Sequence, residues 1–141
     1  LSHSDAWLDR KVGMQGLGVC PRPEALKRLL EVFHDEDAPH RSMAFEALGE
    51  RGQDAVTALD ADLQDADPFK RARAVHVLGR MTDRAAAARL LTVLEDTDPR
   101  VRALADWGLK RHTGKQVGYD PDAAEDTRKA TMAKWRELIK P

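Results

Sequence analysis

One pattern of residues recurs four times along the chain, at intervals of 31, 30 and 31 residues. Each copy begins with an arginine, has a small residue three positions later and a leucine seven positions later. The copies are Arg10–Gly13–Leu17, Arg41–Ala44–Leu48, Arg71–Ala74–Leu78 and Arg102–Ala105–Leu109. Residues at this spacing share one face of an α-helix, so the pattern predicts one helix built four times. A fixed period of this length is typical of a repeat architecture.

A second amphipathic helix precedes three of the four copies. Its apolar positions, three and four residues apart, are Leu26, Leu29 and Phe33, then Val56, Leu59 and Leu63, then Ala87, Leu90 and Leu94. Between the two helices of each unit stand an aspartate and a proline. A carboxylate that accepts free amide protons, next to a proline with a preset φ, is a helix-start signal, which predicts that Asp37, Asp67 and Asp98 are helix caps.

Each unit is therefore expected to be a helix, a short acidic turn and a helix. The first helices are predicted near 24–35, 54–65 and 84–95, and the second near 39–50, 68–80 and 99–112. Glycine follows the leucine in three copies, as Gly18, Gly49 and Gly79. A glycine at the end of a helix commonly adopts the left-handed conformation, so these three are expected to turn the chain back.

The two ends depart from the full repeat. Residues 4–18 match only a second helix, which predicts a half-repeat that leaves Trp7, Leu8, Val12 and Met14 uncovered for self-association or for a further segment. Alternatively, Trp7 closes the core locally. At the other end, a loop at 114–121 leads to a helix at 121–139 that is expected to cover the last repeat. Its apolar stripe is predicted to be Ala124, Thr127, Thr131, Trp135 and Leu138. The chain is thus expected to form a single domain, 1–141, with repeats at 23–52, 53–82 and 83–113.

The order Asp, Pro, Arg, Ala and Leu-Gly in a unit of this length resembles HEAT repeats of the short, phycobilisome-lyase-like type, over residues 4–112. The stretch from Thr113 to Pro121, before a helix with Trp135, is similar to the C-terminal tail of bacterial HEAT-like proteins of unknown function and favours a natural C-terminus. The resemblance implies an all-α fold, a right-handed α-α superhelix whose second helices line the concave side. It also implies a structural ladder between neighbouring repeats, formed by Asp37, Asp67 and Asp98 with Arg41, Arg71 and Arg102.

The positions two and five residues after each arginine lie opposite the buried stripe. In the three full repeats they hold Met43, Glu46, Arg73, His76, Leu104 and Trp107. Aromatic, methionine and arginine side chains are enriched at protein interfaces, so these six residues form our predicted protein-binding face. Two alternatives stay open. In the first, Trp107 is covered by Tyr119 or Trp135 of the C-terminal segment. In the second, Arg73 and His76 are ordinary solvated residues.

Charge is unevenly distributed although the formal net charge is only −1. Residues 31–67 hold eleven acidic and two basic side chains, whereas residues 70–115 hold eleven basic and five acidic ones. A basic half of this kind can follow nucleic-acid phosphates. The simpler interpretation is that oppositely charged repeats attract each other, and the near-neutral total argues against nucleic acid as the partner.

No catalytic or metal-binding motif stands out. The five histidines form no HExxH or similar pair, and the nearest approach to a metal cluster, His34 to Asp37 with His40, is explained by helix capping. Cys20 is the only cysteine, which excludes an intrachain disulfide and favours a reducing compartment such as the cytoplasm. No apolar run is long enough to span a bilayer. The sequence therefore predicts a non-catalytic protein-binding scaffold without a cofactor. The alternatives are a nucleic-acid-binding solenoid that uses residues 70–115 and a lyase-like accessory protein.

Overall fold

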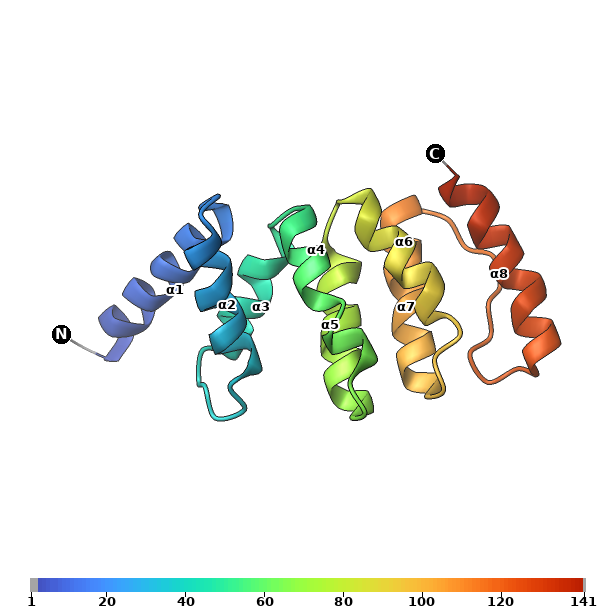
Figure 1. Cartoon of the computed structure of the whole chain (residues 1–141), viewed down its shortest axis with the longest axis horizontal. Helices are drawn as coiled ribbons and strands as arrows, with labels where there is room; N and C mark the ends of the chain where they lie inside the picture. The colour runs from blue at the N-terminus through green and yellow to red at the C-terminus, as the bar shows by residue number, and fades with distance from the viewer. Residues whose placement is uncertain (1–2, 141) are drawn as a thin grey trace. The chain divides into compact units, whose positions relative to one another are not determined.

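The computed structural model describes residues 3–140, and the side chains of residues 6–140. All regular elements in this part of the chain are helical, which confirms the all-α prediction (Figure 1). The helices are α1 (His3–Val19), α2 (Pro23–His34), α3 (Arg41–Gly49), α4 (Gln53–Leu59), the short 3-10 helix η1 (Asp62–Gln64), α5 (Pro68–Arg80), α6 (Arg84–Val93), α7 (Pro99–Thr113) and α8 (Glu125–Ile139). The chain divides into two compact units, Leu1–Ala55 and Val56–Pro141.

The first unit is a bundle in which α1, α2 and α3 each pack against the other two. Leu29 and Phe33 of α2 and Leu48 of α3 are almost fully buried in it. Arg51 is also buried, and its Nη1 donates to the carbonyl oxygens of Leu17 and Cys20, at 2.8 and 2.7 Å. The carbonyl groups at the end of a helix need such donors, so Arg51 ties the end of α1 to the bundle.

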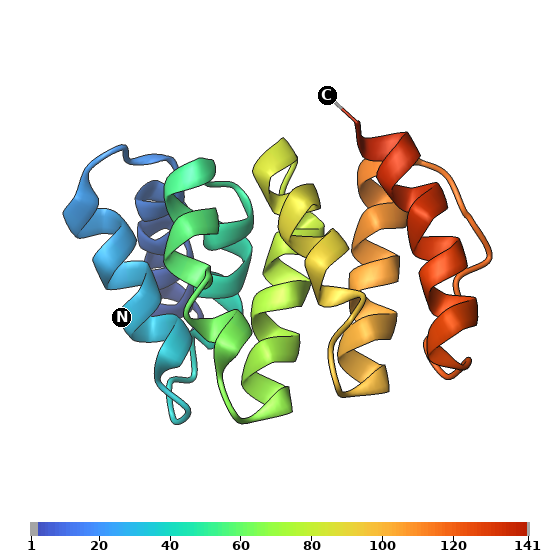
Figure 2. The ribbon, with the colours of Figure 1, turned by 45° about the vertical axis from the view of Figure 1, so that its right-hand side comes forward.

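The second unit is built around α5 and α7, which lie side by side (Figures 1 and 2). Helix α6 packs against both, and α8 lies against α6 and α7. The largest side chains that it buries completely are Val56, Leu59, Val75, Val77, Leu78, Leu90, Leu94, Leu109, Met132 and Trp135. The predicted leucine columns therefore form the core of this unit.

Aspartate caps begin three helices of the second unit, α5, α6 and α7. The carboxylates of Asp67, Asp83 and Asp98 accept hydrogen bonds from the backbone N–H groups two residues later, at 2.9, 2.7 and 2.8 Å. The cap prediction is confirmed for Asp67 and Asp98 and wrong for Asp37. Helix α3 begins at Arg41, with His40 at the cap position and no side-chain cap bond. The reason is that Ala38 separates Asp37 from Pro39, so the two cannot occupy adjacent cap and first-turn positions.

The glycines that follow the leucines do not turn the chain. Gly18 and Gly79 lie within helices, Gly49 is the last residue of α3, and in the described chain a positive φ is found at Gly114 and Gly118. A Cβ atom on Gly18 would lie 2.9 Å from the carbonyl oxygen of Ala47. Close helix packing, and not a left-handed turn, therefore requires glycine there.

The C-terminal segment is joined to the rest of the second unit by two buried hydrogen bonds. The Tyr119 hydroxyl donates to the Leu94 carbonyl at 2.7 Å, and Trp135 Nε1 donates to Asp106 Oδ1 at 3.0 Å. The stripe predicted for this helix is correct only in part. Met132 and Trp135 are the residues of α8 that are buried, whereas Ala124, Thr127 and Leu138 are exposed.

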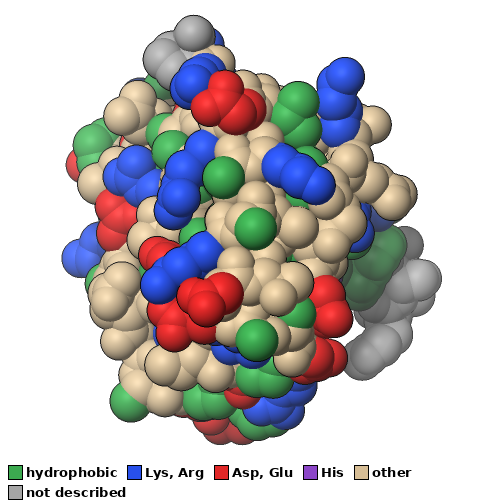
Figure 3. Space-filling view, turned by 90° about the vertical axis from the view of Figure 1, so that its right-hand side faces the viewer, with side chains coloured by type: hydrophobic (Ala, Val, Ile, Leu, Met, Phe, Trp, Pro, Cys, Tyr) green, Lys and Arg blue, Asp and Glu red, His purple; other side chains and the backbone are tan. Residues whose placement is uncertain are grey.

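The outer surface at this end is polar. In Figure 3, which faces the side on which Figure 1 draws α8, basic and acidic side chains alternate with small, separate hydrophobic groups. Ion pairs along α8 contribute to this surface, among them Lys129–Glu125 at 2.6 Å and Lys140–Glu137 at 2.7 Å. A mixed, charged surface of this kind suits the end of a repeat array.

Helix α1 exposes an apolar stripe. Leu8, Val12 and Val19 are 54, 60 and 73% exposed. Trp7 is about half exposed, with the Lys11 ammonium 5.1 Å from its ring, so it does not close the core.

Candidate functional site

Helices α5 and α7 approach to backbone contact at two glycines. A Cβ atom on Gly79 would lie 2.7 Å from Cζ3 of Trp107 and 3.0 Å from Cα of Gly108. A Cβ atom on Gly108 would in turn lie 2.7 Å from a methyl carbon of Leu90. The missing side chain of Gly79 therefore makes room for the indole of Trp107.

Trp107 is held by an aromatic and a cationic neighbour. The His76 ring meets it edge to face, with centroids 5.0 Å apart and an angle of 75°. The guanidinium carbon of Arg111 lies 5.2 Å from the Trp107 ring centroid. Both geometries are attractive for the indole quadrupole, so the half-buried ring is fixed in place by packing.

The surroundings of His76 favour the neutral form of its imidazole. Burial lowers the pKa of its imidazole below the ordinary value, and the positive charges of Arg80 and Arg111 lower it further. A neutral ring avoids a third positive charge beside these two arginines. His76 therefore contributes an aromatic surface and a hydrogen-bonding nitrogen to this part of the molecule.

A second aromatic–arginine contact lies near the start of the same helices. Phe69 is 65% exposed, and the Arg100 guanidinium carbon lies 5.0 Å from its ring centroid. Arg100 also pairs with Asp98 at 2.7 Å, and this bond holds the pKa of the Asp98 carboxyl well below its usual range. Sequence reasoning missed Phe69 and Arg100. They share the position two residues before the repeat arginine, which on α1 holds Leu8.

These contacts define one continuous surface, which we call the α5–α7 face. On each helix its residues follow one another at intervals of four, three and four. The face consists of Phe69, Arg73, His76 and Arg80 from α5, and Arg100, Leu104, Trp107 and Arg111 from α7. Because residues at this spacing lie along one stripe of a helix, the two rows run beside each other.

The six residues predicted for the binding face fall in different surroundings. The structure brings His76 and Trp107 together, with Arg73 and Leu104 half-buried in the same rows. Met43 and Glu46 belong to the first unit. The expectation that Met43 is exposed is wrong, because α3 packs against both α1 and α2 and leaves this side chain only 8% exposed. Glu46 is exposed.

The alternative placement of Trp107 under the C-terminal segment is also not what the structure shows. Tyr119 and Trp135 are buried against Leu94 and Asp106, respectively. Trp107 has its ring contacts with His76 and Arg111.

The repeat arginines form hydrogen bonds to the turn within their own repeat. Each arginine donates to the backbone carbonyl oxygen of an aspartate six residues earlier, at 2.7 to 3.1 Å. The side chain of this aspartate accepts a hydrogen bond from the backbone N–H two residues after the aspartate. The arginines are Arg41, Arg71 and Arg102, and the aspartates are Asp35, Asp65 and Asp96. This repeated network was not predicted from the sequence.

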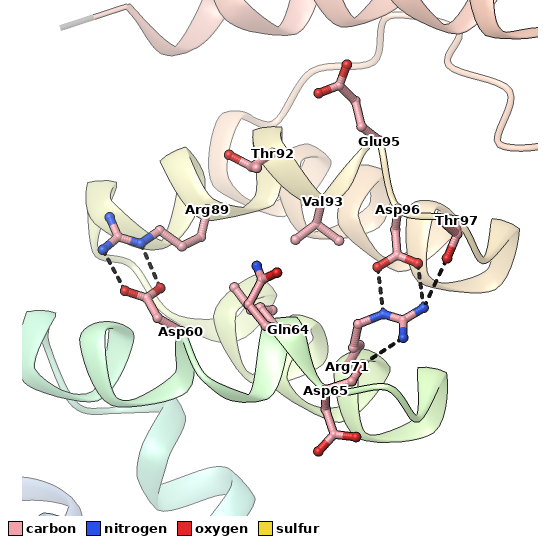
Figure 4. A pocket seen from close by; sticks show the side chains of 11 residues that line it. Asp60, Gln64, Asp65, Arg71, Arg89, Thr92, Val93, Glu95, Asp96 and Thr97 are labelled. Carbon is pink, nitrogen blue, oxygen red and sulfur yellow. Dashed lines mark hydrogen bonds and ion pairs between the residues drawn. The ribbon is translucent and has the colours of Figure 1, made fainter.

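The ladder between repeats differs from the one implied by the family resemblance. Arg71 forms two hydrogen bonds to the carboxylate of Asp96, at 2.8 and 2.9 Å, and not to that of Asp98 (Figure 4). Asp98 instead caps α7. Arg102, the next arginine of the ladder, donates to the carbonyl oxygen of Pro121 and so binds the C-terminal loop. The aspartate that bridges repeats is thus two positions earlier than expected.

A cleft of about 630 Å³ lies between η1 and α6, with Leu63 and Val93 in its lining (Figure 4). The Arg71–Asp96 pair borders one end, and the Arg89–Asp60 pair, with two bonds of 3.0 Å, borders the other. The bonds to Asp96 and Asp60 raise the pKa values of Arg71 and Arg89, so both guanidinium groups stay charged. Because each arginine is already bound to a carboxylate, we interpret this cleft as the joint between neighbouring repeats.

No metal centre or membrane helix is found in the described part of the chain. From residue 6 onward, no three His, Cys, Asp or Glu side chains are grouped so as to hold a metal ion. His40 lies 2.7 Å from Arg10, and the side chain of His3 is outside the described residues. None of the helices in residues 3–140 is both long and apolar enough to span a bilayer.

Comparison with known families explains the repeated helix pairs. Residues 58–131, which include the whole α5–α7 face, match a family model of HEAT repeats. The chain belongs to the HEAT-repeat family. A search of curated proteins found no match to it. HEAT repeats generally act as protein-interaction scaffolds, and in this HEAT-repeat chain the matched region contains the rigid aromatic and arginine side chains described above.

Proposed function

We propose that this chain is a non-catalytic scaffold or adaptor that binds another protein through the α5–α7 face. The observation that supports it best is Trp107, a half-buried indole held by His76 and Arg111 on two tightly packed helices. Tryptophan and arginine dominate the binding energy of protein interfaces. A side chain that is already fixed loses little conformational entropy when a partner binds, so the ring is suited to act as an anchor.

The use of ionisable groups supports a non-catalytic role. In the cleft, Arg71 and Arg89 are paired with Asp96 and Asp60. On the α5–α7 face, His76 packs against an indole and has two cationic neighbours. A general acid or base must reach a substrate proton with a suitable pKa, and these groups serve packing and ion pairing instead.

A pull-down from the lysate of the source organism tests the proposal. We expect a protein to be retained by the wild-type chain and lost by Arg111→Gln, whose exposed side chain can be changed without disturbing the core. Trp107→Ala should lose the same protein. Trp7→Ala, which removes an exposed tryptophan from α1, is the matched control and should retain it. Equal helicity by circular dichroism is required of all four. A partner retained equally by the two α5–α7 variants would refute this function.

A second proposed interaction, self-association, has its own observation. Leu8, Val12 and Val19 form an exposed apolar stripe on α1, and the space above Gly16 in the same stripe is open. Exposed apolar stripes of this kind favour contact with another copy of the chain.

A further inference from the structure

We propose, on the basis of the function proposed above, that the α5–α7 face binds an acidic polypeptide segment with an apolar anchor at its centre. The preceding subsection identifies the surface only as protein-binding. The chemistry of the partner follows from how charge and apolar area are arranged on it.

Helices α5 and α7 have a large excess of positive charge. Helix α5 contains Lys70, Arg71, Arg73 and Arg80 and no acidic residue. Helix α7 contains Arg100, Arg102, Lys110 and Arg111 and one acidic residue, Asp106. Asp106 is buried, accepts a hydrogen bond from Trp135 and pairs with Lys110 at 2.7 Å. Its charge is therefore directed to the interior and to α8, away from the α5–α7 face.

Two of these arginines are bound to neighbouring groups within the fold. Arg71 is bound to Asp96, and Arg102 donates to the backbone carbonyls of Asp96, Thr97 and Pro121. On the face, Arg111 contacts the neutral ring of Trp107, which leaves its charge uncompensated by that contact. Arg100 is paired with Asp98, but its side chain is 65% exposed and so accessible to a partner. The α5–α7 face is therefore electropositive, and a partner with carboxylates complements it.

The positions of the apolar side chains define where the partner's anchor would sit. In the α7 row, Leu104 and Trp107 lie between Arg100 and Arg111. The rise of an α-helix makes this row about 16 Å long, a span matched by a partner helix of about eleven residues. A segment with apolar side chains in its middle and carboxylates toward both ends fits this order, in the manner of a helix that docks along a groove.

A polypeptide fits this surface better than a nucleic acid does. Nucleic-acid sites present aromatic faces on which bases stack, whereas the Trp107 ring has the His76 edge, Arg111 and Gly79 around it. The chain as a whole has a net charge of −1, which does not attract a polyanion over long range.

The test is a selection from a random peptide library displayed on phage, with peptides of about twelve residues to cover the row. The full chain is the bait, and enriched peptides are synthesised with a fluorophore and titrated by anisotropy. We expect enrichment of peptides with Asp or Glu around Leu, Phe or Trp. Their affinity should fall about threefold or more with Arg111→Gln and again when ionic strength is raised. Lys134→Gln, which removes an exposed charge from α8, is the matched control and should leave the affinity unchanged.

The outcomes separate this inference from the function on which it rests. If the enriched peptides need Trp107 but are not acidic, and bind equally at high salt, the inference of an acidic partner is refuted and the proposed protein-binding function of the α5–α7 face stands. If the enriched peptides bind Trp107→Ala and Arg111→Gln with the same affinity as the wild type, both the acidic partner and the protein-binding face are refuted. A selection that enriches nothing also refutes both. A duplex oligonucleotide that binds more tightly than the selected peptides, and loses affinity with Arg111→Gln, shows that the partner is a nucleic acid.

Discussion

At the scale of single residues, the arginines of this chain differ in role according to what surrounds them. Arg71 and Asp96 have side chains only 12% and 10% exposed, and Arg71 also donates to the carbonyl of Asp65. Arg89 and Asp60 form an ion pair of similar geometry at a more open position, 34% and 43% exposed. Burial, and not the distance between the charges, decides how much each pair contributes to stability.

The two pairs provide a matched prediction about the free energy of unfolding. Asp96→Asn removes the carboxylate that neutralises a largely buried guanidinium, and should lower the unfolding free energy by roughly 2–4 kcal/mol. Asp60→Asn breaks an exposed ion pair and should lower the unfolding free energy by less than about 1 kcal/mol. Urea denaturation of the two variants checks this. Equal losses would show that the Arg71–Asp96 pair does not join the repeats more strongly than the exposed one.

Asp98 gives a prediction about acid stability. Arg100 lowers the pKa of its carboxyl in the folded chain, so the folded state favours the ionised form. This stabilisation is present above the ordinary aspartate pKa of about 4 and is lost as the pH falls below it. Asn is also a good helix cap but does not titrate. We therefore expect thermal melting temperatures measured from neutral pH downward to fall less steeply for Asp98→Asn. Identical slopes would contradict this.

At the scale of helices, glycine permits close packing. Gly79 and Gly108 allow α5 and α7 to approach until a Cβ atom on Gly79 would lie 3.0 Å from the Gly108 Cα. The same contact makes room for Trp107. Gly16 of α1, in contrast, has open space where its side chain would be. Two helical glycines of the same chain are thus under opposite constraints.

Substitution of each glycine by alanine should have opposite effects. Gly79→Ala forces Trp107 or the α7 backbone to move and should destabilise by about 1–3 kcal/mol. Gly16→Ala meets nothing and should stabilise by about 0.5–1 kcal/mol, because alanine favours the helix. Denaturant midpoints measure both. In addition, the intrinsic fluorescence of Gly79→Ala should change if the Trp107 ring is displaced, and an unchanged stability would show that the two helices adjust without cost.

At the scale of the whole molecule, the two terminal helices differ in their outer surfaces. The outer side of α8 is charged and mixed in sign (Figure 3), whereas α1 exposes Leu8, Val12 and Val19. In the described part of the second unit the exposed large hydrophobic side chains, Phe69 and Leu138, lie on different helices and form no such stripe. Contact between copies is therefore expected through α1.

Sedimentation velocity over a range of concentrations checks this expectation. We expect weak, concentration-dependent dimers of the wild type, and monomers of Val12→Glu at every concentration, because a buried carboxylate in the contact is costly. Phe69→Glu removes an equally exposed apolar side chain from the other unit and should still dimerise. A wild type that stays monomeric throughout would show that α1 is not a self-association surface.

Repeat length, the positions of most helices, the Asp67 and Asp98 caps and the leucine core followed from the sequence, because helical periodicity and cap chemistry act over one or two turns of chain. Two helices differ from the prediction: the one expected at 54–65 is divided into α4 and η1, and the one expected at 121–139 begins at Glu125. His76 and Trp107 of the predicted face also stand in the same column of neighbouring repeats. The short α3, however, buries Met43 because three helices meet there. That outcome depends on packing and not on the column in which the residue stands.

Only the tertiary structure decided which side chains of different helices meet. Three contacts join residues between 25 and 31 positions apart in the chain. Arg71 pairs with Asp96 and not with Asp98, Phe69 lies under Arg100, and Gly79 lies beneath Trp107. Sequence spacing determines the face on which such residues lie. The offset between packed helices, which spacing does not specify, determines their contacts.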